Sequence, residues 1–314
     1  MNSDSEKNIT ISPLGKSIIK TLAYYDIFDY PLTSEEIFYN LETNHVSLTE
    51  VLNEIEKLFN SCLVYKESNF YLLRNKKDFV DKRLAGNELA EKRMKSAYRM
   101  SKFISKFPYV RAILLSGSIS KGYMEKESDI DYFIITHPNR LWFTRLVLML
   151  FKKTFLFNSR KMFCINYFVD TETLEIEEKN IFTATELATL IPTYGSRLYD
   201  ELHLKNYWVK DFYPNFPKRN TITISENKSG GFKYLCEKFF NKKIGDKLDD
   251  FSMSLFEKSN QKKYRDYNSK DFQVAFKTSK RESKHHPKFF QKRVLEAFND
   301  KLKSFENNYN VTLD

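Results

Sequence analysis

The chain has few cysteines and lacks a long apolar run. Its three cysteines, Cys62, Cys164 and Cys236, are far apart in a sequence of 314 residues. An odd number of widely spaced cysteines predicts reduced thiols and excludes a disulfide framework and a zinc cluster. The most apolar window, 141–151, contains Arg145 and is followed by two lysines. It is too short to span a bilayer, so the sequence predicts no membrane span.

The N-terminus lacks the features of a targeting signal. Its first ten residues, MNSDSEKNIT, are polar and acidic, whereas a signal peptide has an apolar segment and a transit peptide is poor in acidic residues. Together with the reduced cysteines, this predicts a cytoplasmic protein. A hydrophobic content of 41% indicates a globular chain.

Positive charge is concentrated in the last third of the chain. The net charge is +10. Residues 216–314 contain 22 Lys and Arg against 13 Asp and Glu, a net charge of +9, and residues 1–215 contain 29 against 28. A basic region of this kind can hold nucleic acid, a triphosphate or an anionic membrane surface. A solvated lysine-rich surface explains the same pattern equally well.

One central stretch carries most of the chemical information. Residues 110–136 read VRAILLSGSISKGYMEKESDIDYFIIT, with apolar runs at 110–115 and 130–135 that predict two buried strands. Because side chains alternate along a strand, Asp129 and Asp131 are predicted to project from the same face. Two adjacent carboxylates repel unless a cation lies between them, and oxygen ligands suit Mg²⁺.

The end of the first predicted strand suits a phosphate. Gly117 and Ser118 follow the apolar run. They offer backbone N–H groups and a hydroxyl, and the glycine has no Cβ to block a close approach of phosphate oxygens. The stretch therefore combines a predicted phosphate-binding turn with a predicted pair of metal-binding acids.

This pattern resembles the nucleotidyltransferase superfamily with a DNA polymerase beta-like core, over residues 110 to about 175. The resemblance implies that Gly117 and Ser118 bind the phosphates of an NTP, and that Asp129 and Asp131 hold Mg²⁺ or Mn²⁺ and are catalytic. Further candidates for phosphate binding or orientation are Ser116, Lys121 and Ser128. The implied fold is α/β (α+β), a mixed sheet flanked by helices.

The chain departs from this family at one position. Residues 161–170 predict the next strand, where the family places a third carboxylate, and the matching position holds Asn166. An amide can ligate a metal through its oxygen but cannot accept a proton as a base. Asp170 shares the face of Asn166 but lies roughly 13 Å further along the strand. The nearest acids in the sequence are Asp170, Glu172 and Glu175.

Three interpretations of Asn166 remain open. Another acid serves as the base, the metal alone acidifies the acceptor, or the protein binds nucleotide without turning it over. The resemblance implies transfer of NMP from an NTP to an acceptor hydroxyl on a small molecule, a protein or an RNA end. The alternative is a catalytically impaired nucleotide-binding regulatory protein whose output comes from an N-terminal winged helix.

The N-terminal residues resemble a winged-helix domain. Apolar spacing predicts helices at 13–25, from Thr33 onward and at 47–59, followed by a hairpin at 63–73. Thr33 and Glu36 match a capping box. The third helix offers an acidic outer face, with Glu50, Glu54, Glu56 and a single basic residue, Lys57. Such a face is repelled by phosphates, so a structural or partner-docking role is favoured over DNA binding.

The sequence predicts three parts, namely a winged-helix-like domain at 1–75, a nucleotidyltransferase core with a leading helix at 76–180, and a helical, basic region at 181–314. In the last part, 181–191 is predicted as a helix that Pro192 ends. A cluster of aromatic residues at 194–216 has two interpretations, core filling or a stacking surface for a base or sugar.

Overall fold

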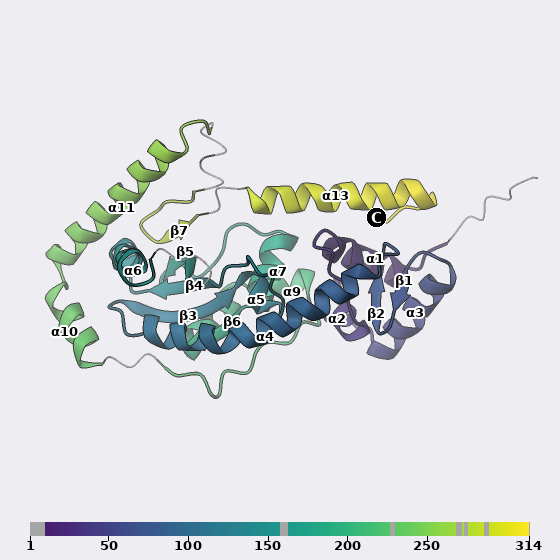
Figure 1. Ribbon diagram of the computed structural model, residues 1–314, viewed down its shortest axis with the longest axis horizontal. Coiled ribbons are helices and arrows are strands. Elements are labelled where there is room, and N and C mark those ends of the chain that lie inside the picture. Colours follow the sequence, from purple (N-terminus) through teal and green to yellow (C-terminus); the bar gives the residue numbers. More distant parts are fainter. Residues whose placement is uncertain are drawn as a thin grey trace, which may run out of the picture.

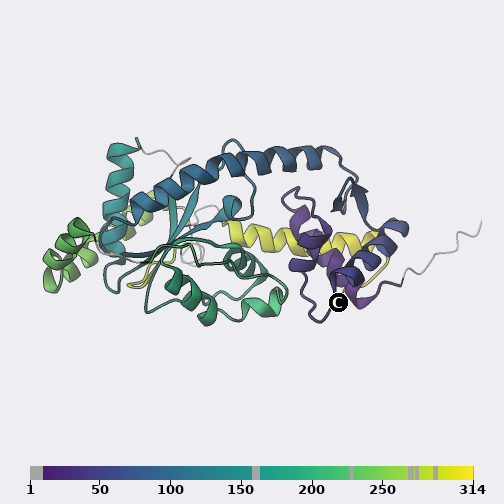
Figure 2. The same cartoon turned by 90° about the horizontal axis from the view of Figure 1, so that it is seen from below.

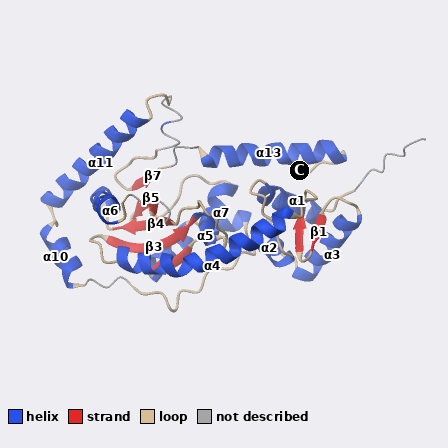
Figure 3. Cartoon of the chain, in the orientation of Figure 1, coloured by secondary structure: helices blue, strands red, loops and turns tan. Residues whose placement is uncertain are grey.

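The computed structural model describes residues 10–157, 163–226, 230–267, 272, 276–285 and 289–313. The fold is mixed α/β, as predicted. A five-stranded mixed sheet is flanked by helices, and a two-stranded antiparallel hairpin lies apart from it (Figure 1). Colouring by secondary structure separates these two groups of strands clearly (Figure 3).

The N-terminal part, residues 10–75, has the predicted order of helices and hairpin. It consists of α1 (Pro13–Asp26), α2 (Ser34–Tyr39), α3 (Leu48–Asn60), β1 (Tyr65–Glu67) and β2 (Phe70–Leu72). Capping boxes at Thr33 and Ser47 satisfy the first backbone N–H groups of α2 and α3. The helices therefore begin where the sequence signals a start.

The prediction for one side chain of α3 is wrong. Glu54 is not on the outer face, since its side chain is only 9% exposed and pairs with Lys57 at 2.9 Å. It also accepts a hydrogen bond from Ser12 Oγ, at the start of α1. The position faces α1 because α1 packs across α3 there. The outer face of α3 keeps Glu50 and Glu56, which are exposed.

The core sheet has the strand order β6-β3-β4-β5-β7. Its strands are β3 (Val110–Ser116), β4 (Asp131–Thr136), β5 (Cys164–Asp170), β6 (Ile191–Tyr194) and β7 (Glu282–Lys284). β4 is antiparallel to β3 and parallel to β5, and both edge strands are antiparallel to their neighbours. The first two residues of the strand predicted at 161–170 lie outside the described residues.

Both edge strands come from the region predicted to be helical. The helix predicted at 181–191 is shorter, because α7 spans Ile181–Thr189 and Pro192 lies within β6 rather than beyond the helix. Proline is tolerated there since β6 is an edge strand, where one side of the backbone needs no partner. β7 lacks an apolar pattern, but its Ser283 accepts a hydrogen bond from buried Arg145 at 2.6 Å.

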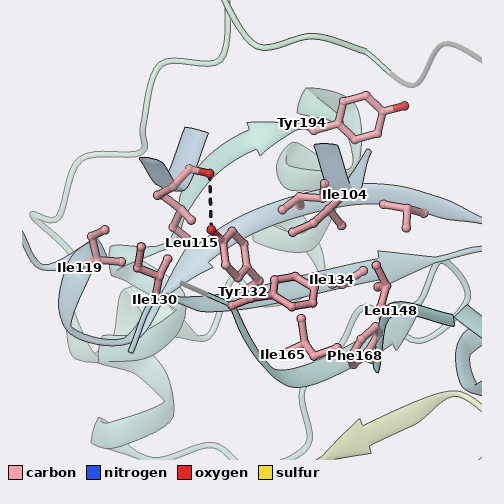
Figure 4. Close-up of a cluster of buried hydrophobic side chains, with 14 of the residues drawn as sticks. Ile104, Leu115, Ile119, Ile130, Tyr132, Ile134, Leu148, Ile165, Phe168 and Tyr194 are labelled. Atoms are coloured by element: carbon pink, nitrogen blue, oxygen red, sulfur yellow. Dashed lines mark hydrogen bonds between the residues drawn. The ribbon is translucent and has the colours of Figure 1, made fainter. Parts of the chain in front are cut away.

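The two faces of the core sheet are covered by different helices. One face packs against α4 (Asp78–Ile104) and α6 (Leu141–Phe155), and Figure 4 shows Leu115, Tyr132, Ile134 and Phe168 pointing into this cluster. The opposite face, with Leu114, Phe133 and Val169, packs against α7, α8 (Ser196–Lys205) and α9 (Val209–Phe212). The aromatic residues Tyr194, Tyr199 and Tyr213 are buried among these elements, which confirms core filling for them.

The remaining helices frame the molecule. α10 (Gly231–Phe239) and α11 (Lys243–Lys263) lie at the end of the core remote from the N-terminal part (Figure 1). α13 (Phe290–Tyr309) runs from the core to the N-terminal part, and α4 runs between the same two parts (Figures 1 and 2). Within the described ranges, no helix combines the length and the apolar composition that crossing a bilayer demands.

Candidate active site

A cleft with a volume of about 740 Å³ lies between the core sheet, α7, the end of α1 and the start of α13. The structure brings every site residue predicted from the sequence to this cleft. Its lining includes Ser116, Gly117, Ser118, Lys121, Ser128, Asp129, Asp131 and Asn166.

The turn after β3 faces the first residue of β4. Ser116 pairs with Asp131 across the two strands, and the chain then turns at Gly117 into the short helix α5 (Gly117–Ser120). Gly117 has a φ of +68°, and a Cβ built on it would lie 2.5 Å from Asp131 Oδ2. Only glycine combines this backbone conformation with so close an approach. The turn and the acid therefore form one wall of the cleft.

Asp129 and Asp131 lie together, although only Asp131 belongs to β4. Burial, with the nearby carboxylates of Glu186 and Asp129, raises the pKa of Asp131 to about 7. Negative charges gathered in a partly desolvated place are the environment that a divalent cation stabilises. The donor set of two carboxylates beside the Gly117 turn therefore fits Mg²⁺ or Mn²⁺.

Asn166 occupies the place beside Asp131 that the sequence assigns to it. Its Nδ2 donates a hydrogen bond to Asp131 Oδ1 at 2.9 Å, and its Oδ1 accepts one from the Cys164 thiol at 3.2 Å. In this arrangement the amide orients Asp131 and does not present its oxygen as a third ligand. Burial and the two aspartates raise the pKa of Cys164 to about 12, so this thiol is not a nucleophile near neutral pH.

The acids nearest in sequence to Asn166 do not reach the cleft. Asp170 pairs with Thr136 at the far end of β4 and accepts a hydrogen bond from the Glu172 N–H at 3.0 Å. Glu172 pairs with Arg281 at 2.7 Å, and Glu175 pairs with Lys179 at 3.0 Å. None of these three acids lines the cleft, so none of them lies where it could take the place of the missing carboxylate.

The acid that does face this wall is Glu186 on α7, which no motif predicts. Its Oε2 accepts a hydrogen bond from the Gly117 N–H at 3.3 Å, and its Oε1 pairs with Lys121 Nζ at 2.7 Å. It is one of the residues that raise the pKa of Asp131. The available signal is a lone charged residue in the otherwise uncharged helix IFTATELAT.

Two of the three further candidates, Lys121 and Ser128, have partners for their side chains in the structure. Lys121 Nζ also donates to the Gly117 carbonyl at 3.1 Å, so it stabilises the turn as well as pairing with Glu186. Ser128 Oγ accepts a hydrogen bond from the Glu125 N–H at 3.0 Å, which orders the loop before Asp129. Lys121 therefore links the Gly117 turn to α7, and Ser128 acts on the loop conformation.

The N-terminal part also lines the cleft, which the sequence motif does not predict. Tyr24, Phe28 and Tyr30, from the end of α1 and the loop after it, contribute side chains. The Tyr30 hydroxyl donates to the Lys121 carbonyl at 3.2 Å, close to the Gly117 turn. Arg83 of α4 pairs with Glu36 of α2 at 2.5 Å and fixes this part against the core.

Comparison with known proteins assigns no role to the residues of this cleft. No family model matches the chain, and neither a curated protein nor a solved structure is similar to it. In the part of the chain that the structure describes, no three or more His, Cys, Asp or Glu side chains are grouped as a metal site. A metal would therefore be held by two protein acids and completed by other ligands, such as substrate phosphates.

Proposed function

We propose that the chain is a nucleotidyltransferase, which transfers NMP from an NTP to an acceptor hydroxyl. The observation that carries this proposal is the contact between the Gly117 turn and Asp131, with Asp129 beside it. A turn that offers backbone N–H groups lies directly opposite a pair of acids. This is the arrangement needed to hold the two ends of a metal-bound triphosphate.

Asp129 and Asp131 would hold Mg²⁺ or Mn²⁺, with Asn166 orienting Asp131. The bound ion supplies electrostatic stabilisation of the entering and leaving oxygens. The Gly117 N–H, the Ser118 hydroxyl and the Lys121 ammonium would bind phosphate oxygens. In the chain alone Glu186 holds two of these donors, so an incoming triphosphate competes with Glu186 for them.

The reaction is an in-line displacement at the α-phosphorus. The acceptor oxygen forms a new P–O bond, the bond from the α-phosphorus to the bridging oxygen breaks, and pyrophosphate leaves with that electron pair. The acceptor proton must pass to a base, and Asn166 cannot serve. Glu186 is our candidate, because a triphosphate that takes its partners releases its carboxylate beside Asp131.

DNA is not part of this proposal. The outer face of α3 exposes Glu50 and Glu56, with Lys57 as its basic residue. A helix that enters a DNA groove needs cationic or amide side chains along that face. The N-terminal part instead contributes to the wall of the cleft.

The test uses α-labelled NTPs, Mg²⁺ and a cell extract as the source of acceptor. We expect label to pass to an acceptor with the wild-type chain, and the rate to fall by more than about 100-fold in Asp129→Asn and Asp131→Asn. Asp211→Asn, an exposed acid on α9, is the matched control and should keep the rate. Mg²⁺-dependent nucleotide binding without transfer of label would contradict the enzyme and support the regulatory alternative.

A further inference from the structure

The cleft continues from the two aspartates into a chamber with aromatic walls. Phe133 lies two residues beyond Asp131, on the same face of β4. Its ring packs against the ring of Tyr167 on β5, with centroids 4.9 Å apart. One step of two residues along a strand covers about 6.6 Å. The floor of the cleft therefore changes from acidic to aromatic within one such step. Both rings line the cleft.

Three phenylalanines from three different elements form the outer wall of this chamber. Phe290 at the start of α13 lies 6.3 Å from Phe28 and 5.8 Å from Phe182 of α7, measured between ring centroids. Phe290 is 43% exposed although its partners belong to a packed cluster. We call the space bounded by Phe28, Phe133, Tyr167, Phe182 and Phe290 the aromatic chamber.

Ion pairs and a ring contact join the elements that supply the walls of the chamber. Asp26, at the end of α1, pairs with Lys301 of α13 and with Arg74 at 2.8 Å. Tyr24 packs against Phe298 of α13 with centroids 5.6 Å apart. The N-terminal part and α13 are thereby joined to each other. A cleft of about 740 Å³ has the size of a small-molecule site.

The charge of the cleft is opposite to that of the whole chain. Seven acidic side chains line it, against three lysines. The acids are Asp29, Glu125, Glu127, Asp129, Asp131, Glu178 and Glu186, and the lysines are Lys82, Lys121 and Lys284. Each lysine is paired with an acid of the same lining, at 3.0 Å or less. Beyond Lys121, which the proposed triphosphate would occupy, the described lining offers only lysines that are already in ion pairs, so a long polyanion such as an RNA end gains little there.

We infer that the aromatic chamber is the acceptor site, and that it takes a neutral or cationic small molecule with an aromatic or similarly flat apolar body and a hydroxyl group. This inference rests on the proposed function, because an acceptor is needed only if the protein transfers NMP. A ring bound against Phe133 and Tyr167 places a hydroxyl within one strand step of Asp131. The N-terminal part then serves as a wall of the substrate site.

Three phenols that share a ring and a hydroxyl but differ in charge test this inference. They are tyramine, 4-ethylphenol and 4-hydroxyphenylacetate, and their binding to the full chain is measured by ligand-observed NMR titration. We expect the cation and the neutral phenol to bind, and the anion to bind at least about tenfold more weakly. Binding of the anion as tightly as the cation, or of none of the three, would overturn the inference.

Variants locate the binding and separate it from the nucleotide site. Phe182→Ala and Phe290→Ala should each weaken the binding of 4-ethylphenol at least about tenfold. The control is Phe239→Ala on α10, where the side chain is 70% exposed, and it should leave this binding unchanged. Thermal shift with Mg·ATP checks that each variant is folded and tests the nucleotide site independently. Failure of ATP to bind wild type counts against the proposed function alone.

Titration of the phenols in saturating Mg·ATP shows whether the chamber binds the acceptor or the adenine base of the nucleotide. If the chamber holds the acceptor, the phenols bind to the ATP-loaded chain with their affinity retained or increased. If ATP displaces them competitively, the chamber holds the nucleotide base, and the inference is wrong.

Discussion

At the scale of single residues, Glu186 stands where the substrate phosphate is expected to bind. Its carboxylate already holds the Gly117 N–H and the Lys121 ammonium. A negative side chain in a phosphate site weakens binding of the phosphate, whereas the same group, once released, can accept a proton. These two roles act on different kinetic quantities, so they can be measured separately.

The variant Glu186→Gln should therefore bind nucleotide more tightly and transfer it more slowly. We expect the Kd for Mg·ATP to fall by about threefold to tenfold, because the competing charge is removed, and kcat to fall by about 100-fold. Calorimetric titration and single-turnover rates measure the two effects. Glu201→Gln, exposed on α8, is the control. An unchanged kcat would show that Glu186 is not the base.

Gly117 and Gly122 form a natural pair for testing the turn. Both have positive φ, +68° and +69°, but a Cβ at Gly122 would meet only Asn87 Nδ2 at 3.8 Å, whereas one at Gly117 would lie 2.5 Å from Asp131 Oδ2. We expect Gly122→Ala to lower the free energy of unfolding by about 1 kcal/mol and Gly117→Ala by about 3 kcal/mol. Only Gly117→Ala should lose Mg·ATP binding. Equal effects of the two substitutions in denaturant titrations would contradict the contact with Asp131.

The sequence predicts the residues of the motif well because they are local. A glycine and a serine after one strand and two acids at the start of the next are fixed in space by the hairpin-like pairing of β3 with β4. Glu186, Phe182 and Phe290 are brought to the same cleft by packing of distant helices, for which a single sequence carries no spacing rule. The prediction of Asn166 beside Asp131 succeeds because β4 and β5 are neighbours.

At the scale of elements, the edge strands show what a pattern of apolar residues cannot predict. β6 contains a proline, and β7 consists of Glu282, Ser283 and Lys284, which have no apolar alternation. Their place in the sheet depends on long-range partners, such as the hydrogen bond from the Tyr167 hydroxyl to Glu282 at 2.7 Å. A helix with regular apolar spacing carries its own signal, and α3, predicted at 47–59, spans Leu48–Asn60.

The packing of α8 contains a histidine that resists protonation. His203 lies 4.4 Å from the ring of Tyr199, measured between centroids, and its Nε2 has no hydrogen-bond partner among the described residues. Burial and nearby Lys218 and Lys210 lower its pKa to about 4, against the opposing effect of Asp200. The unfolded chain therefore binds a proton at His203 below pH about 6.5, before the folded chain does.

This histidine should make the fold less stable in mild acid. The stability is present above pH about 6.5 and is lost as the pH falls toward about 4, by about 2 kcal/mol. Between pH 7.5 and 4.5, the free energy of unfolding of His203→Gln should therefore fall by about 2 kcal/mol less than that of the wild type. Denaturant titration at both pH values measures the difference. The exposed His45→Gln is the control. Identical pH dependence in wild type and His203→Gln would refute the assignment.

At the scale of the whole molecule, α13 joins the two ends of the structure. Its Val294 and Phe305 are buried in the cluster formed by α1, α2, α3 and the hairpin, and Phe290 reaches the cleft. The N-terminal part and the core are therefore predicted to unfold together rather than as separate units. The domain boundaries predicted at 75 and 180 do not reveal this coupling, because it depends on contacts between residues far apart in the sequence.

Phe305→Ala tests this coupling. Removing a phenylalanine that is 6% exposed should lower the free energy of unfolding by about 3 kcal/mol. Both tryptophans, Trp142 and Trp208, belong to the core clusters and not to that of the N-terminal part, so their fluorescence reports a distant region. We expect the fluorescence midpoint in urea to fall with the far-UV signal. An unchanged fluorescence midpoint would mean that the two parts unfold independently.

The position of α13 in the chain has a consequence for how the protein is made. The helices and hairpin of the N-terminal part are synthesised well before α13, whose side chains complete their apolar cluster. Until α13 has been synthesised, the apolar surface of the N-terminal part that α13 covers in the fold is therefore exposed to water. A product that stops before α13 lacks both the cover of that face and one side of the aromatic chamber.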